Sequence, residues 1–101
     1  MAIRKLVRDK IPQILRKSGI RGGTFRRARR NAIPTLLLEK LDEEVCELRE
    51  NVCLEELADV AEVLREISIV NGFKWLSVER ERTKKRRQKG GFARKILMTS
   101  R

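Results

Sequence analysis

The stretch "TLLLEKLDEEVCELREN", residues 35–51, decides the fold because its apolar residues recur at helical spacing. Successive members of the set stand four, four, three and four residues apart, which places them on one face of a helix. The set comprises Leu37, Leu41, Val45 and Leu48 within the stretch and Val52 directly after it. Pro34 suits the first helical position, where its missing N–H costs nothing. The spacing therefore predicts a helix that starts at Pro34 and buries one apolar stripe.

A second helical pattern, "LEELADVAEVLREISIVNG" at residues 54–72, follows after a very short break. Its apolar residues again share one face. They are Leu57, Val60, Ala61, Leu64 and Ile67. Asn71 and Gly72 form a typical helix stop. Two amphipathic helices joined by so short a link predict an antiparallel helical hairpin.

Weaker patterns flank the hairpin on both sides. We expect a short helix from Asp9 to Lys17, with Asp9 as its N-cap, and a third helix over about residues 75–88. The glycine- and arginine-rich residues 21–30 predict a loop.

The two ends of the chain, "AIRKLV" at residues 2–7 and "FARKILMTS" at residues 92–100, alternate weakly between apolar and polar residues. This alternation favours a short terminal strand pair. The fold class that follows is all-α, a small helical bundle in a single domain of residues 1–101 with that strand pair added.

Composition limits both the core and the partners. A chain of 101 residues buries only about 60–65% of its unfolded surface, so we expect dimerisation to complete the bundle. The first residues lack a secretory signal and no apolar run spans a bilayer, which predicts a cytoplasmic protein without a membrane partner. The net charge of +11 favours anionic partners such as nucleotides or nucleic acid.

The chain has no histidine and no tyrosine, so catalysis has to use carboxylates, lysine, serine, cysteine or a metal. Cys46 and Cys53 stand seven residues apart without a CxxC motif, which gives no support for a zinc site or a disulfide framework. We expect both cysteines to be packing residues.

The carboxylates of the hairpin fall into two groups when each residue is placed about 100° around its helix from the last. Four border the apolar stripes as two i, i+3 pairs: Glu44 with Glu47, and Glu56 with Asp59. The others point away from the stripes, and they include Glu39, Glu43, Glu50, Glu55, Glu62 and Glu66. Packing the two stripes together predicts one cluster of four carboxylates.

Such a cluster is costly unless positive charge compensates it. A divalent cation would do so, and ligands that are all hard oxygens favour Mg²⁺ or Mn²⁺. The alternative is an ion-pair network with the many lysines and arginines, and the spacing alone leaves both open.

These residues resemble a known family. Glu-Glu-x-x-Glu at residues 43–47 and Glu-x-x-Asp at residues 56–59, on consecutive helices, are similar to the motif of the all-α nucleotide pyrophosphohydrolases of the MazG and phosphoribosyl-ATP pyrophosphohydrolase type. "KLVRDKIP" at residues 5–12 and "KGGFARKIL" at residues 89–97 look like the ends of a small branch of that family. The resemblance therefore spans most of the chain.

The resemblance implies Mg²⁺-dependent hydrolysis of a nucleoside triphosphate or related nucleotide between the α and β phosphates, in a helical dimer or tetramer. By position it implies Glu44, Glu47, Glu56 and Asp59 as metal ligands. Of these, Glu44 and Glu47 are the catalytic candidates. The link between the acid pairs is shorter than in most such enzymes, which leaves the substrate open.

Basic residues of the two flanking motifs are the candidates for binding the substrate's phosphates. They are Arg8, Lys10, Lys89 and Arg94. The basic run "RERTKKRRQK", residues 80–89, allows a second class of function, a nucleic-acid-binding module. A third alternative is a non-catalytic helical interaction protein.

Overall fold

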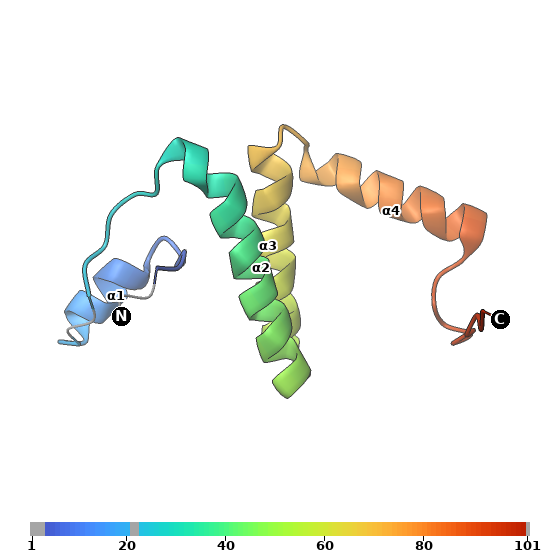
Figure 1. Cartoon of the computed structure of the whole chain (residues 1–101), viewed down its shortest axis with the longest axis horizontal. Coiled ribbons are helices and arrows are strands. Elements are labelled where there is room, and N and C mark those ends of the chain that lie inside the picture. Colours follow the sequence, from blue (N-terminus) through green and yellow to red (C-terminus); the bar gives the residue numbers. More distant parts are fainter. Residues whose placement is uncertain (1–3, 21–22, 101) are drawn as a thin grey trace.

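The centre of the fold is a helical hairpin, seen in a computed structural model that describes residues 4–20 and 23–100 (Figure 1). Helix α2 covers Ile33–Glu50 and helix α3 covers Leu54–Val70, and the two pack side by side. Every regular element of the described chain is a helix, which confirms the all-α class. The predicted hairpin is also confirmed.

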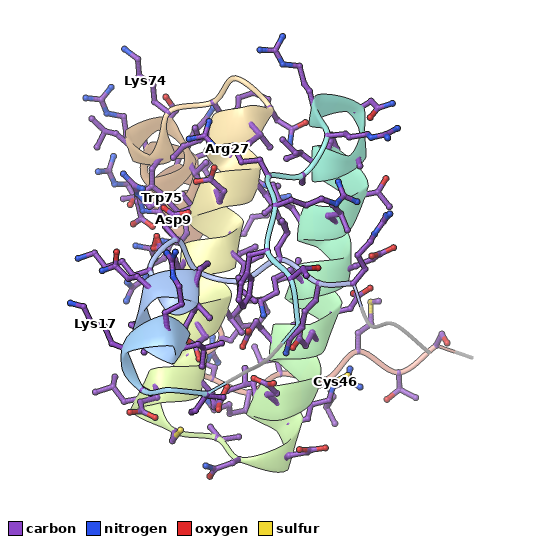
Figure 2. The ribbon with its side chains drawn as sticks, turned by 90° about the vertical axis from the view of Figure 1, so that its left-hand side faces the viewer. Asp9, Lys17, Arg27, Cys46, Lys74 and Trp75 are labelled. Atoms are coloured by element: carbon purple, nitrogen blue, oxygen red, sulfur yellow. The ribbon has the colours of Figure 1, made fainter. Side chains whose placement is uncertain are left out.

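The link of the hairpin is only three residues long, from Asn51 to Cys53. Asn51 leaves the helical conformation, and its backbone N–H donates to the carbonyl oxygen of Glu47 at 3.1 Å. Cys53 is half-buried beside this turn, whereas Cys46 is exposed and points away from the hairpin (Figure 2). The prediction that both cysteines are packing residues is therefore wrong for Cys46.

Helix α1 covers Ile11–Lys17 and starts two residues later than predicted. Asp9 is not its N-cap, because Pro12 has no N–H to give and the Ile11 N–H is bonded to the Arg8 carbonyl oxygen at 3.0 Å. Gly19 ends the helix with a φ of 70°, as its sequence position predicts.

A 3₁₀ helix, η1 (Arg30–Ala32), leads into α2 at the end of the predicted loop. Helix α4 covers Trp75–Lys89 and leaves the hairpin at a steep angle (Figure 1). The corner before α4 is fixed by Ser68, whose buried hydroxyl donates to the Phe73 carbonyl oxygen at 3.0 Å. Gly72 lies in this corner with a φ of 83°, a conformation that glycine adopts without strain.

The predicted terminal strand pair is not formed by the described residues. Residues 92–100 have no strand, and neither do residues 4–7; residues 2–3 lie outside the description. Helix α4 carries the C-terminal tail to the side of the hairpin away from the N-terminal segment (Figure 1), so the two ends cannot pair within one chain.

The hydrophobic core is small. Leu36 and Leu37 are the buried apolar residues of the described chain, and neither is completely shielded from solvent. The radius of gyration is 17.5 Å, compared with about 13 Å for a compact chain of this length. No described helix has both the length and the apolar content that crossing a membrane requires.

Shortening a core leucine tests how far stability depends on this hairpin. The side chain of Leu37 is 6% exposed, so we expect Leu37→Ala to lower the free energy of unfolding by about 2–4 kcal/mol, from lost burial and the cavity left behind. Urea denaturation followed by circular dichroism measures this. The matched control is Leu97→Ala, since Leu97 is 91% exposed, and an equal loss in both variants would contradict the assignment of the core.

Candidate metal centre

Three carboxyl groups from the two helices of the hairpin meet at one point. Glu44 comes from α2, and Glu56 and Asp59 come from α3; one oxygen from each lies within 4.8 Å of the other two. Glu44 is only 7% exposed, and the other two are half-buried. The i, i+3 spacing puts Glu56 and Asp59 on one side of α3, so three of the four residues predicted to cluster do so.

Two oxygens of this cluster have no hydrogen-bond partner. Oε2 of Glu44 and Oε2 of Glu56 are both shielded from solvent, and nothing in the described chain donates to either. Leaving a buried acceptor unsatisfied is costly, and more so when it carries charge. The donor set is made of hard carboxylate oxygens, which is the chemistry that Mg²⁺ and Mn²⁺ prefer. These residues therefore fit a divalent cation.

Glu47, the fourth predicted member, lies against Glu44 at the exposed edge of the cluster. Its pKa is raised, first by a hydrogen bond with the Glu44 carboxyl group and then by repulsion from that group. The pKa of Glu56 is raised as well, first by burial and then by repulsion from Asp59 and Glu44. Both shifts show that the charged forms lack sufficient positive compensation.

Some positive charge does reach the cluster. Nη2 of Arg8 lies 2.7 Å from Oδ1 of Asp59, and Nζ of Lys40 lies 3.1 Å from Oε1 of Glu44. Burial alone would lower the pKa of Lys40, but its hydrogen bonds to Glu44 and Glu43 outweigh burial and raise it. The ion-pair network considered as the alternative to a metal is therefore present in part.

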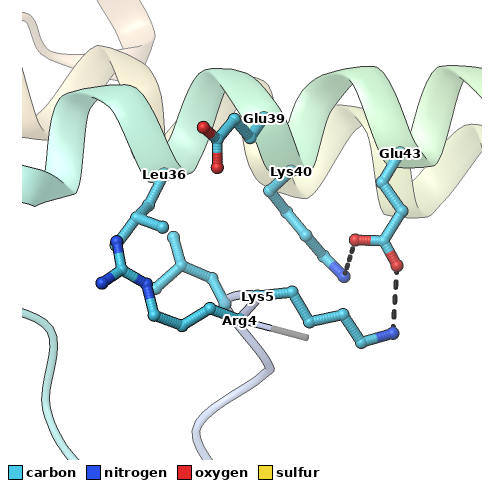
Figure 3. A pocket seen from close by; sticks show the side chains of 7 residues that line it. Arg4, Lys5, Leu36, Glu39, Lys40 and Glu43 are labelled. Atoms are coloured by element: carbon cyan, nitrogen blue, oxygen red, sulfur yellow. Dashed lines mark hydrogen bonds and ion pairs between the residues drawn. The ribbon is translucent and has the colours of Figure 1, made fainter. Parts of the chain in front are cut away.

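The network extends to Glu43, which accepts hydrogen bonds from Lys5 at 3.1 Å and from Lys40 at 3.2 Å (Figure 3). Burial alone would raise the pKa of Glu43, but these two bonds lower it. With Glu43 included, the cluster and its neighbours contain five carboxylates and three cations. When all are ionised there is an excess of two negative charges, which one divalent cation would neutralise. The carboxylates are Glu43, Glu44, Glu47, Glu56 and Asp59, and the cations are Lys5, Arg8 and Lys40.

The acids predicted to point away from the helix interface do so, with one exception. Five of them are exposed: Glu39, Glu50, Glu55, Glu62 and Glu66. The exception is Glu43, which is half-buried. The N-terminal segment covers this side of α2, and the angular position of Glu43 on its own helix does not show that.

The predicted phosphate-binding residues are spread over the molecule. Arg8 lies at the cluster, and Lys10 is exposed just before α1. Lys89 and Arg94 are exposed at the end of α4 and beyond it, on the other side of the hairpin from the N-terminal segment (Figure 1). Of these four predicted residues, one chain therefore brings Arg8 alone to the carboxylates.

Sequence reasoning missed Lys40 and Lys5. Lys40 had a local signal, because it stands three and four residues before Glu43 and Glu44, where helical side chains meet. Lys5 had none, since it is 38 residues from Glu43 along the chain.

A pocket of about 350 Å³ lies between the N-terminal segment and α2, next to the cluster (Figure 3). Lys40 borders both the pocket and Glu44. The lining residues are Arg4, Lys5, Leu6, Leu36, Glu39, Lys40 and Glu43. Three of these are cations and two are carboxylates, and Lys5 and Lys40 are paired with Glu43, so Arg4 is the lining cation that remains outside the ion pairs of the described residues.

Comparisons of the chain with models of protein families, with curated proteins and with solved structures find no match. The resemblance to the nucleotide pyrophosphohydrolases therefore stays a prediction, and the carboxylate cluster is the feature from which a function can be inferred.

The raised pKa values give the metal-free protein a defined response to pH. The folded-state pKa values of Glu47 and Glu56 lie above the ordinary value of 4.5, so the folded protein binds their protons more tightly than the unfolded chain does. Their favourable contribution to the free energy of unfolding is therefore complete below pH 4.5 and is lost as the pH rises through the raised pKa values. We expect Glu56→Gln to match the parent protein in Tm near pH 4 and to exceed it at pH 7 in the presence of a chelator, by differential scanning fluorimetry. Glu62→Gln, an exposed position of the same helix, is the control with a Tm difference that does not change with pH. A Glu56→Gln protein less stable than the parent at pH 7 would show that the carboxylate is well compensated.

Proposed function

We propose that this protein is a Mg²⁺-dependent nucleotide pyrophosphohydrolase. The observation that carries the proposal is the pair of shielded, unpartnered oxygens, Oε2 of Glu44 and Oε2 of Glu56, within a cluster of carboxylates shared by two helices. A structural ion-pair network would be expected to satisfy such atoms, because an unpaired buried charge is destabilising. A site prepared for a cation leaves them free.

Glu44, Glu56 and Asp59 would hold the cation. Bound there, Mg²⁺ would supply positive charge that screens phosphate oxygens and makes water a better nucleophile. Arg8 would fix the orientation of Asp59 by its 2.7 Å contact with Oδ1, as residues behind metal ligands commonly do.

Glu47 is the proposed general base. It lies beside Glu44 but outside the group of three close oxygens, and its side chain is open to solvent. A carboxylate in that position can accept a proton from water that attacks a phosphate next to the cation. Its use is consistent with a chain that contains no histidine.

The substrate would bind on the side of the N-terminal segment. Arg4 and Lys5 line the pocket beside the cluster, and Lys10 follows on the same segment. Cations at this position suit a polyphosphate, and arginine suits it best because its planar guanidinium binds two oxygens at once. The resemblance to the nucleotide pyrophosphohydrolases implies which bond is cleaved: the one between the α and β phosphates, with release of pyrophosphate. Lys89 ends α4 and Arg94 follows it, and α4 runs away from the hairpin on the side opposite the N-terminal segment (Figure 1), so neither residue is assigned to the substrate of the same chain.

We propose further that two copies associate through the outer face of the hairpin. Leu38 on α2 and Leu57 and Leu64 on α3 are 55%, 51% and 41% exposed. Leu57 and Leu64 were predicted to be buried, but α2 covers only part of the apolar face of α3. A second hairpin packed there would form a four-helix bundle and enlarge the core.

Activity assays test the catalytic proposal. With Mg²⁺ we expect pyrophosphate release from one or more members of a broad nucleotide panel, lost on chelation. Glu44→Gln and Asp59→Asn should each lower the rate at least about 100-fold, because each removes a direct ligand of the cation. Substituting a residue that only supports a metal ligand already lowers activity by up to about 100-fold. Glu62→Gln is the control that keeps full activity.

Metal binding separates a failed active site from a failed fold. Mg²⁺ should raise the Tm of the parent protein by mass action, and Glu56→Gln should abolish that rise while folding normally. If Glu44→Gln and Asp59→Asn both hydrolyse nucleotides at the parent rate, the carboxylate cluster is not the active site.

Sedimentation equilibrium tests the dimer. We expect a mass twice the chain mass of 11.8 kDa, and a monomer for Leu57→Lys or Leu64→Lys, because a lysine at a packed apolar position carries an unpaired charge into the interface. Ala58→Lys, at an exposed position of the same helix, is the control; a parent protein of single-chain mass would contradict the proposal.

A further inference from the structure

Helix α4 has a surface unlike that of any other element. From residue 80 to residue 89 its sequence is "RERTKKRRQK", which contains seven basic residues, one acidic residue and no apolar residue. Over a length of about 15 Å every side chain in this part of the helix is exposed. We call residues 80–89 the basic arm.

The basic arm is not used in packing the chain. Helix α4 contacts α3 near the corner, where Trp75 and Val78 are half-buried, and then runs away from the hairpin (Figure 1). Arg82 is paired with Glu79 at 2.8 Å. Among the described residues no other cation of the arm has a carboxylate partner, so most of its charge is available to a ligand.

The basic residues are concentrated toward the C-terminal end of α4. Glu79 lies toward its start, and Arg86, Arg87 and Lys89 occupy the last turn, where positive charge interacts favourably with the helix dipole. The cations therefore project from a regular rod in all directions around its axis, since successive residues are about 100° apart.

The partner follows from this distribution. A protein groove or insertion into a bilayer would require an apolar stripe on the helix, and the basic arm has none, so an anionic membrane would hold it by surface charge alone. Single-stranded nucleic acid is bound largely by stacking on aromatic side chains, and the arm has no aromatic residue. What remains is a rigid, densely charged polyanion whose phosphates are recognised without stacking, which describes a nucleic-acid duplex.

We propose that the basic arm of α4 binds double-stranded nucleic acid through its phosphate backbone, without reading its sequence. This activity is independent of the carboxylate cluster, which lies on the hairpin. Binding of this kind is weak and salt-dependent: a Kd on the order of 1–100 μM near 0.15 M salt is typical of contacts to phosphates alone.

The test is fluorescence anisotropy with labelled 20-base-pair duplexes of DNA and RNA over a series of KCl concentrations. The variant Lys84→Gln/Lys85→Gln/Arg86→Gln/Arg87→Gln removes four cations from the arm and keeps good helix formers. We expect its affinity to fall at least tenfold, and the slope of log K against log salt to shrink in magnitude by about 2–4, because each lost phosphate contact removes up to 0.9 from the slope.

The matched control removes the same charge from another place. Arg26→Gln/Arg27→Gln/Arg29→Gln/Arg30→Gln changes four arginines before α2 and should keep the salt slope and nearly all of the affinity. An equal loss in both variants would overturn the proposal, because binding would then follow net charge and not the arm. Circular dichroism confirms that both variants retain the parent's helical content.

Competitors complete the test. An unlabelled duplex of unrelated sequence should displace the probe, whereas a single strand of equal length should compete at least tenfold more weakly. The proposal is overturned if the single strand competes as well as the duplex, or if the parent protein does not bind duplex at 0.05 M KCl. It is also overturned if phosphatidylserine vesicles bind the protein by flotation more tightly than duplex does and the arm variant abolishes this binding, because the arm's partner would then be an anionic membrane.

Discussion

Packing α2 against α3 brings carboxyl groups together along with leucines, and the rest of the structure depends on how that charge is compensated. Glu44 is as deeply buried as Leu37, and it meets Glu56 and Asp59 across the helix interface. The N-terminal segment supplies part of the compensation through Arg8 on Asp59 and, indirectly, Lys5 on Glu43. The cations of both pairs are more than half exposed, and ion pairs open to solvent contribute at most about 1 kcal/mol each. The two ion pairs therefore fix the position of the N-terminal segment on the hairpin but add little to the stability of the protein.

Arg8 and a cation need not compete for Asp59. Arg8 contacts Oδ1, and a carboxylate has a second oxygen with its own lone pairs. A guanidinium on one oxygen holds the carboxylate in a single orientation, which is the usual work of residues behind a metal ligand. The shielded oxygens of Glu44 and Glu56 then become the atoms whose satisfaction depends on what binds between them.

The spacing of residues along the sequence predicted the features that depend on a single helix. The hairpin, the stop at Asn71 and Gly72, and the outward direction of Glu55 and Glu62 all follow from helical spacing, and the structure has them. Spacing could not predict contacts between residues that are far apart in the sequence. Arg8 and Asp59 are 51 residues apart, and no periodicity links them.

The other errors have separate physical causes. The start of α1 was misplaced because Pro12 and the turn at Arg8 remove the N–H groups that an N-cap needs. The terminal strand pair was predicted from weak alternation at both ends, but the course of α4 keeps those ends apart. Cys46 was assigned to packing by residue type, yet it lies on the outer side of α2.

The basic arm and the small core have one origin in the composition. A helix without an apolar residue between positions 80 and 89 cannot add to a hydrophobic core, so α4 buries only its first turns against α3. The hairpin is left to supply nearly the whole core, and two buried leucines are few for a chain of 101 residues. The proposed dimer would add burial that a 15-residue helix of this kind does not supply. In that proposal the exposed leucines on α2 and α3 supply the added burial, and residues 80–89 of α4 take no part in it.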